Sequence, residues 1–115
     1  MTAQTEAEFY EQALSAVGQG NDTLASIHLK NALQRNRVHL PSRILLGRLY
    51  LKNGEPAAAE KELRRAIDLE ADPNLILEPL GYSLLLLERF DEIQDFEVPI
   101  ETSRPVRFEW SMIKG

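Results

Sequence analysis

Few side chains in this sequence stand in a pattern that could support catalysis or nucleotide binding. Gly18 and Gly20 form half of a nucleotide-binding glycine fingerprint, but they follow a predicted helix instead of a strand and lack the third glycine. The segment GYSLL at residues 81–85 resembles a nucleophile elbow without its final glycine, and it lies within a predicted helix. An interhelix turn and a helix interior explain the two segments better.

Histidines and carboxylates are the remaining candidates for acid–base or metal chemistry. His28 and His39 are the only imidazoles, and they lie on different predicted elements, which is poor spacing for a metal site. A group of carboxylates follows at the predicted sixth helix: Asp91, Glu92, Asp95 and Glu97. A hydrolase or enzyme accessory would need a histidine to converge with them in one pocket. We expect a solvated helix end instead, with no enzyme activity, no cofactor and no metal.

Composition and net charge disfavour several classes of binding partner. The chain has 115 residues and no cysteine, so it is the size of one domain and has neither disulfides nor thiolate ligands. Its formal net charge of −5 disfavours nucleic acid and anionic membranes. The most apolar run, residues 75–87, contains Glu78 and Pro79 and is too short to span a bilayer. The N-terminal segment MTAQTEAEFY lacks the pattern of a secretory signal. The sequence does not indicate the cellular compartment of the protein.

Small and apolar residues recur at a fixed period. The same separation divides Ala25 from Ala59, Leu29 from Leu63, Ala32 from Ala66, Gly20 from Gly54, and Gly47 from Gly81. This period, about 34 residues, and the order of the residue types resemble the tetratricopeptide repeat, a helix–turn–helix unit. Two of the repeat's usual residues are absent, because Arg43 replaces its tryptophan and Ala71 its proline, with Pro73 two positions later.

The resemblance implies an all-α superhelix of about three helical hairpins, the last incomplete. Apolar spacing predicts seven helices, with Asp22 or Thr23 capping the second, Pro79 delaying or bending the fifth, and the seventh starting near Arg104. We expect a repeat domain over residues 1–97, with repeats at about 6–38, 40–73 and 74–97. Residues 98–115 are expected to be a linker and the frayed start of a further repeat helix.

The first helix of each hairpin lines the concave face of such a stack, where extended ligands dock. We therefore expect a protein or peptide ligand there, and a chain that is monomeric or weakly self-associating. Arg48 and Lys52, one turn apart, could hold a carboxylate between tyrosines, although exposed side chains and packing between repeats explain the pattern equally well. Tyr10 and Leu14 do not supply the lysine and asparagine clamp of chaperone-binding members. The predicted contact residues are Tyr10, Leu14, Val17, Ile44, Arg48, Leu51, Lys52, Glu78, Tyr82 and Leu85.

Four segments extend the resemblance over residues 8–95: FYEQAL, LKNALQ, SRILLGRLYL and NGEPAAAEKELRRAIDLEADP. They resemble the opening repeats of the large tetratricopeptide lipoproteins of the PEP-CTERM and exosortase sorting system. That resemblance implies a noncatalytic, periplasmic cell-envelope scaffold linked to exopolysaccharide export or protein sorting. The chain departs from that group because it is short, lacks a lipobox cysteine and ends within a repeat. These departures fit an excised fragment and equally permit a small cytoplasmic adaptor.

Overall fold

The computed structural model describes residues 3–115, in which seven α-helices and no strand occur, as the all-α prediction required. The helices are α1 (Glu6–Gly18), α2 (Asp22–Arg35), α3 (Leu40–Lys52), α4 (Pro56–Asp68), α5 (Pro73–Leu86), α6 (Phe90–Asp95) and α7 (Arg104–Lys114).

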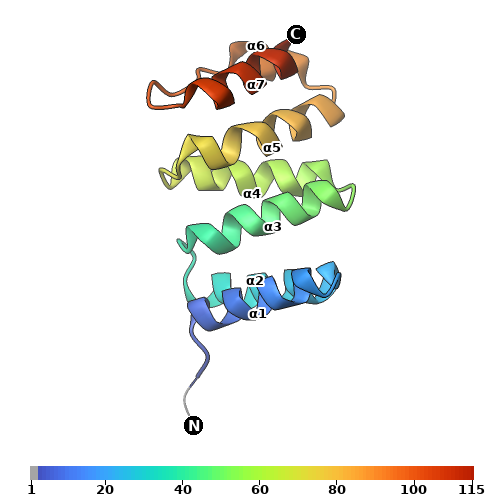
Figure 1. Cartoon of the computed structure of the whole chain (residues 1–115), viewed down its shortest axis with the longest axis vertical. Helices are drawn as coiled ribbons and strands as arrows, with labels where there is room; N and C mark the ends of the chain where they lie inside the picture. The colour runs from blue at the N-terminus through green and yellow to red at the C-terminus, as the bar shows by residue number, and fades with distance from the viewer. Residues whose placement is uncertain (1–2) are drawn as a thin grey trace.

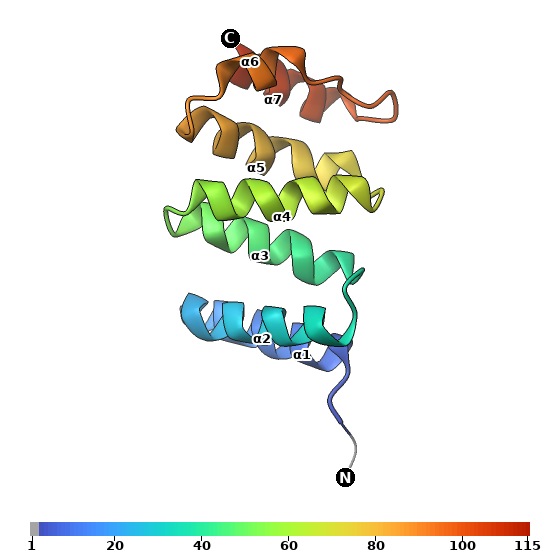
Figure 2. The same ribbon diagram turned by 180° about the vertical axis from the view of Figure 1, so that it is seen from behind.

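The helices stack along one axis into an elongated body of 52 × 27 × 21 Å. In Figure 1, α1, α3, α5 and α7 follow one another up the near face, and the N- and C-termini lie at opposite ends. Figure 2 shows α2, α4 and α6 on the opposite face. Two antiparallel hairpins, α1–α2 and α3–α4, are therefore followed by a third group built from α5, α6 and α7.

Helix ends repeat the same backbone geometry. At the ends of α1, α3 and α5, the residues in the left-handed conformation are Gly20 (φ 75°), Gly54 (φ 79°) and Glu88 (φ 58°). Glycine adopts this conformation without the Cβ clash that other residues suffer, so Glu88 carries a backbone cost that the two glycines avoid. The start of α2 differs from expectation: Asn21 is its cap, with Oδ1 accepting from the Leu24 N–H at 3.1 Å.

A close helix contact explains the small residues of the second hairpin. A Cβ built on Gly47 would lie 2.9 Å from Leu63 Cγ, which is closer than real side chains tolerate. Leu63, Ala59 and Ala66 are fully buried on α4. Glycine on α3 therefore allows the leucine of α4 to fill the space between the helices.

Helix α5 starts at Pro73 and contains Pro79 in its interior. The sequence predicted that Pro79 either delays the helix start to about Glu78 or bends the helix, and the first of these alternatives is wrong. The Asp72 carboxylate accepts from the Asn74 N–H at 2.9 Å and caps this early start.

The third group breaks the repeat register. Ile93, Glu97 and Ile100 stand one repeat period after Ala59, Leu63 and Ala66. A glutamate cannot replace the buried leucine, and Ile100 is 92% exposed, so α6 is short and ends at Asp95.

Helix α7 supplies the packing that α6 cannot provide. A Cβ on Gly81 would lie 2.9 Å from both Trp110 Cζ3 and Ile113 Cδ1, and both side chains are buried. Gly81 thus meets α7 as Gly47 meets α4. Helix α7 begins at Arg104, as the apolar spacing predicted, and this packing holds it against α5. The assignment of residues 98–115 to a linker and the frayed start of a further repeat stays a prediction.

Candidate functional site

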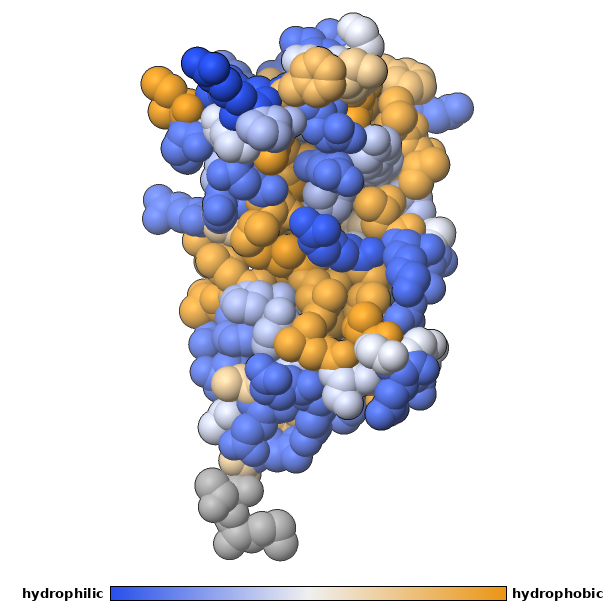
Figure 3. Space-filling model, viewed as in Figure 1, coloured by the Kyte–Doolittle hydropathy of each residue, from blue (hydrophilic) through white to orange (hydrophobic). Residues whose placement is uncertain are grey.

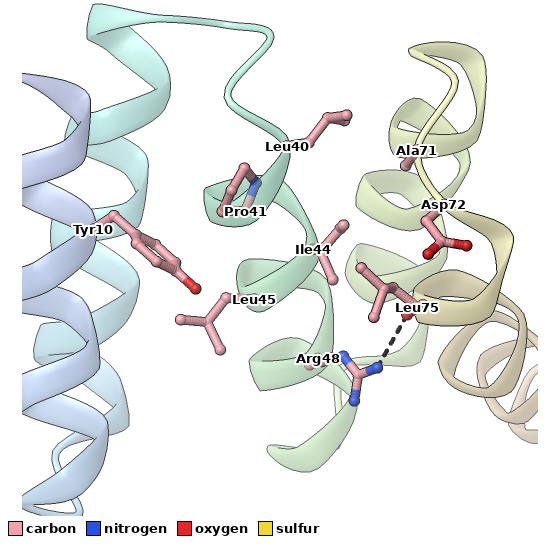
Figure 4. A pocket seen from close by; sticks show the side chains of 9 residues that line it. All are labelled: Tyr10, Leu40, Pro41, Ile44, Leu45, Arg48, Ala71, Asp72 and Leu75. Carbon is pink, nitrogen blue, oxygen red and sulfur yellow. Dashed lines mark hydrogen bonds between the residues drawn. The ribbon is translucent and has the colours of Figure 1, made fainter.

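A groove of about 480 Å³ lies on the face formed by α1, α3 and α5. Its walls come from three places: α1, the first turns of α3, and the α4–α5 turn with the start of α5 (Figure 4). Apolar surface gathers in the middle of this face of the molecule (Figure 3). The residues that line the groove are Tyr10, Leu40, Pro41, Ile44, Leu45, Arg48, Ala71, Asp72 and Leu75.

Helical spacing on α3 places most of the groove floor. Ile44 and Arg48 are one turn apart, so they project from the same side of α3, with Leu40 and Pro41 one turn earlier. Tyr10 reaches the groove from α1, as Figure 4 shows, and its ring meets the His39 ring edge to face at 5.7 Å. The groove therefore joins the first hairpin to the second.

Arg48 has a partner inside the protein. Its Nη2 donates to the Leu75 carbonyl oxygen at 3.0 Å, which is the bond drawn in Figure 4. In a regular helix this carbonyl would accept from the N–H one turn later, but that residue is Pro79, which has no N–H. Arg48 thus supplies the donor that the proline removes, and its side chain also lines the groove.

Three of the ten predicted contact residues meet in the groove, and seven do not. Tyr10, Ile44 and Arg48 line it. Val17 and Leu51 are half-buried and pack against the two hydrophobic cores. Leu14, Glu78 and Leu85 are exposed outside the groove.

The two remaining predicted contacts are engaged elsewhere in the protein. Lys52 pairs with Asp22 of α2, with Nζ 3.1 Å from Oδ2. Tyr82 donates to Glu109 of α7 at 3.0 Å, and this bond raises the pKa of the Tyr82 hydroxyl. Arg48 and Lys52 therefore have different partners in this structure, and the joint carboxylate site that their spacing allowed stays a prediction.

Sequence reasoning missed six lining residues: Leu40, Pro41, Leu45, Ala71, Asp72 and Leu75. Most of them belong to the first turns of α3 and α5 or to the turn between repeats. One signal was present, because Pro41 and Leu75 are one repeat period apart and so occupy the same position in successive repeats.

The histidines and carboxylates that could have formed an active site are separated. His28 lies on α2 and His39 directly precedes α3, whereas α6 lies near the C-terminal end of the stack (Figure 1). The His39 Nδ1 is 2.7 Å from Ser42 Oγ. Among residues 3–115, no three His, Asp or Glu side chains converge as a metal site would require.

One of these acidic residues, Glu92 of α6, is engaged in ion pairs. Glu92 accepts from Arg89, and from Arg64 of α4 at 3.0 Å. The hydrogen bond from Arg89 lowers the pKa of the Glu92 carboxyl below its ordinary value. Glu92 therefore joins α6 to α4 as a charged residue.

Comparison with known proteins supports one family. A model of the tetratricopeptide repeat matches residues 16–76, which is more than half of the chain. No curated protein and no solved structure matches the sequence. In the part of the chain that the structure covers, no helix has the length and apolarity to cross a membrane. The repeat period, the stacked hairpins and this match together show that the chain belongs to the tetratricopeptide repeat family.

Proposed function

We propose that this protein is a noncatalytic interaction module that binds an extended peptide segment of another protein in the groove between α1, α3 and α5. Tetratricopeptide repeats are typically protein-binding scaffolds, which supports the general class. The observation that carries the proposal is the groove itself, in which apolar side chains from separate repeats form one surface.

The chemistry of the groove suits a peptide with aliphatic side chains. Ile44, Leu45 and Leu75 offer an apolar wall, while Tyr10 and Arg48 provide polar groups at its edge. Ligand sites commonly combine apolar walls with a few polar groups that fix orientation. Among the described residues that line the groove, Arg48 alone is basic, which argues against nucleic acid as its ligand.

Peptide selection tests this function before any partner is identified. Short peptides would be selected from a displayed random library, synthesised, and their Kd measured by calorimetry. Leu75→Glu places a charge in the groove, and Leu86→Glu makes the same change on the same helix at an exposed position outside it. We expect Leu75→Glu to weaken binding by at least about tenfold, or about 1.4 kcal/mol, and Leu86→Glu to leave it unchanged. Equal effects of the two substitutions would overturn the groove assignment.

A narrower role rests on the segments within residues 8–95 that resemble PEP-CTERM-system lipoproteins. We propose that the chain belongs to a cell-envelope scaffold linked to exopolysaccharide export or protein sorting. The parent reading frame tests this role. A lipobox-bearing signal peptide and further repeats would support it, whereas a frame limited to these residues would favour a small cytoplasmic adaptor.

A further inference from the structure

A second cleft lies on the face opposite the groove. It has a volume of about 420 Å³ and is lined from α2, the α2–α3 turn, α3 and α4. Figure 2 shows α2 and α4 on this face, with α3 between them. The lining residues are Lys30, Leu33, Gln34, Arg37, Arg43, Leu46, Tyr50, Glu62 and Arg65.

The charge of this cleft is opposite to that of the whole molecule. Four basic side chains and one carboxylate line it, although the chain carries a formal net charge of −5. Within residues 3–115, Lys30 and Arg37 form no ion pair with a carboxylate, and the Lys30 Nζ lies 5.9 Å from the centre of the Tyr50 ring. The cleft therefore concentrates positive charge that the protein leaves uncompensated.

A buried donor points to a ligand of matching chemistry. The Arg43 side chain is only 9% exposed, and its guanidinium donates to Glu62 at 2.7 Å and to the Arg37 carbonyl at 2.6 Å. Its Nε is buried and has no acceptor among the described residues. A buried N–H without an acceptor is costly. Arg43 therefore places a charged guanidinium with an incomplete set of acceptors in the wall of the cleft.

The floor of the cleft distinguishes between kinds of anion. Leu33, Leu46 and Tyr50 present apolar surface beside the basic groups. Inorganic phosphate would leave this surface uncovered, whereas a peptide that carries apolar side chains between carboxylates would contact both. We propose that this cleft binds an acidic peptide segment of a partner protein, with an apolar side chain on Leu33 and Leu46 and carboxylates at Lys30 and Arg37.

The probe is a short peptide in which glutamates alternate with leucine and phenylalanine. Its binding to the isotopically labelled chain would be followed by the amide signals of Leu33 and Tyr50 and by the Arg43 Nε–H signal. We expect saturable shifts at these groups. Peptides with glutamine for glutamate, or serine for the apolar residues, should bind at least about tenfold more weakly because each lacks half of the recognition.

Charge reversal tests the location. Lys30→Glu with Arg37→Glu changes two exposed cleft residues, and Lys61→Glu with Lys114→Glu makes the same change of net charge at exposed positions outside the cleft. We expect the first pair to weaken binding at least about tenfold and the second pair to have less than about a twofold effect. Leu75→Glu in the groove should leave it unchanged, so this inference can fail without the proposed function failing.

Three results would overturn the inference: no saturable binding of the acidic peptide, equal loss in both charge-reversal pairs, or equal shifts with inorganic phosphate or a single-stranded oligonucleotide. The second result would indicate attraction by net charge alone. The third would assign the cleft to phosphate chemistry.

Discussion

Arg48 Nη2 lies 3.0 Å from the carbonyl oxygen of Leu75, the oxygen that Pro79 leaves without its helical donor. This bond joins α3 to α5 and lies beside the groove, since Arg48 and Leu75 both line it. The arginine that the sequence suggested as a ligand contact therefore also connects two successive repeats.

The first prediction tests the link between Arg48 and Pro79. Arg48→Met should destabilise the fold by about 0.5–1.5 kcal/mol, because the Leu75 carbonyl loses its donor. Pro79→Ala restores a helical N–H to that carbonyl, so Arg48→Met should cost at least about 0.5 kcal/mol less in this background. Urea unfolding of the four proteins of this cycle measures the coupling. Additive effects would mean that Arg48 does not act through the freed carbonyl.

A second prediction concerns the fully buried Leu63. Leu63→Ala should destabilise the chain by about 2–5 kcal/mol because it leaves a cavity against Gly47. Gly47→Leu should also destabilise, since even a Cβ there would lie 2.9 Å from Leu63 Cγ. The denaturation midpoint in urea gives both values. An unchanged midpoint for Leu63→Ala would contradict the hairpin packing.

The third prediction uses the turn after α5. Glu88 has φ 58°, whereas glycines occupy the corresponding turns after α1 and α3. Glu88→Gly should stabilise the protein by about 0.5–1 kcal/mol by relieving the left-handed backbone. Glu88→Ala serves as the control, because it removes the same carboxylate and keeps the Cβ. Equal midpoints of thermal unfolding for the two variants would be inconsistent with backbone strain at this turn.

Acid stability gives the fourth prediction. The hydrogen bond from Arg89, together with the charges of Arg89 and Arg64, lowers the pKa of Glu92 in the folded protein from 4.5. Ionised Glu92 therefore stabilises the folded protein fully above pH 4.5. This stabilisation is lost as the pH falls from there through the lowered pKa of the folded state. Glu92→Gln should flatten the fall in stability below pH 4.5. Glu97→Gln, at an exposed site outside the ion pairs, should leave the profile unchanged, and matching profiles for both variants would refute the assignment.

Most of the fold that could be predicted from the sequence was predicted from residues that recur at the repeat period. Gly47, Leu63 and the alanines of α4 recur because two helices must approach closely, and that requirement is local to one hairpin. The position of α7 could not be read in the same way. Glu97 and Ile100 show that the repeat register fails, but only tertiary packing selects Trp110 and Ile113 as the replacement partners of Gly81.

The site was less predictable than the fold for a related reason. Position within a repeat placed Tyr10, Ile44 and Arg48 on one face, and these three residues line one groove. It could not foresee that Lys52 pairs with Asp22 or that Tyr82 binds Glu109, because Asp22 lies on another hairpin and Glu109 lies on α7, which packs outside the repeat pattern. The residues in the first turns of α3 and α5 line the groove because of the distance between adjacent repeats, and position within one repeat does not give that distance.

The most direct test of the central claim is a map of the amide and side-chain signals that change when a library-selected peptide is titrated into the labelled protein. Saturable changes at Tyr10, Ile44, Arg48 and Leu75, with little response at Ile27 and Leu86, are the predicted result. If a peptide that binds tightly leaves the four groove residues unchanged and shifts another face, the groove is not the binding site.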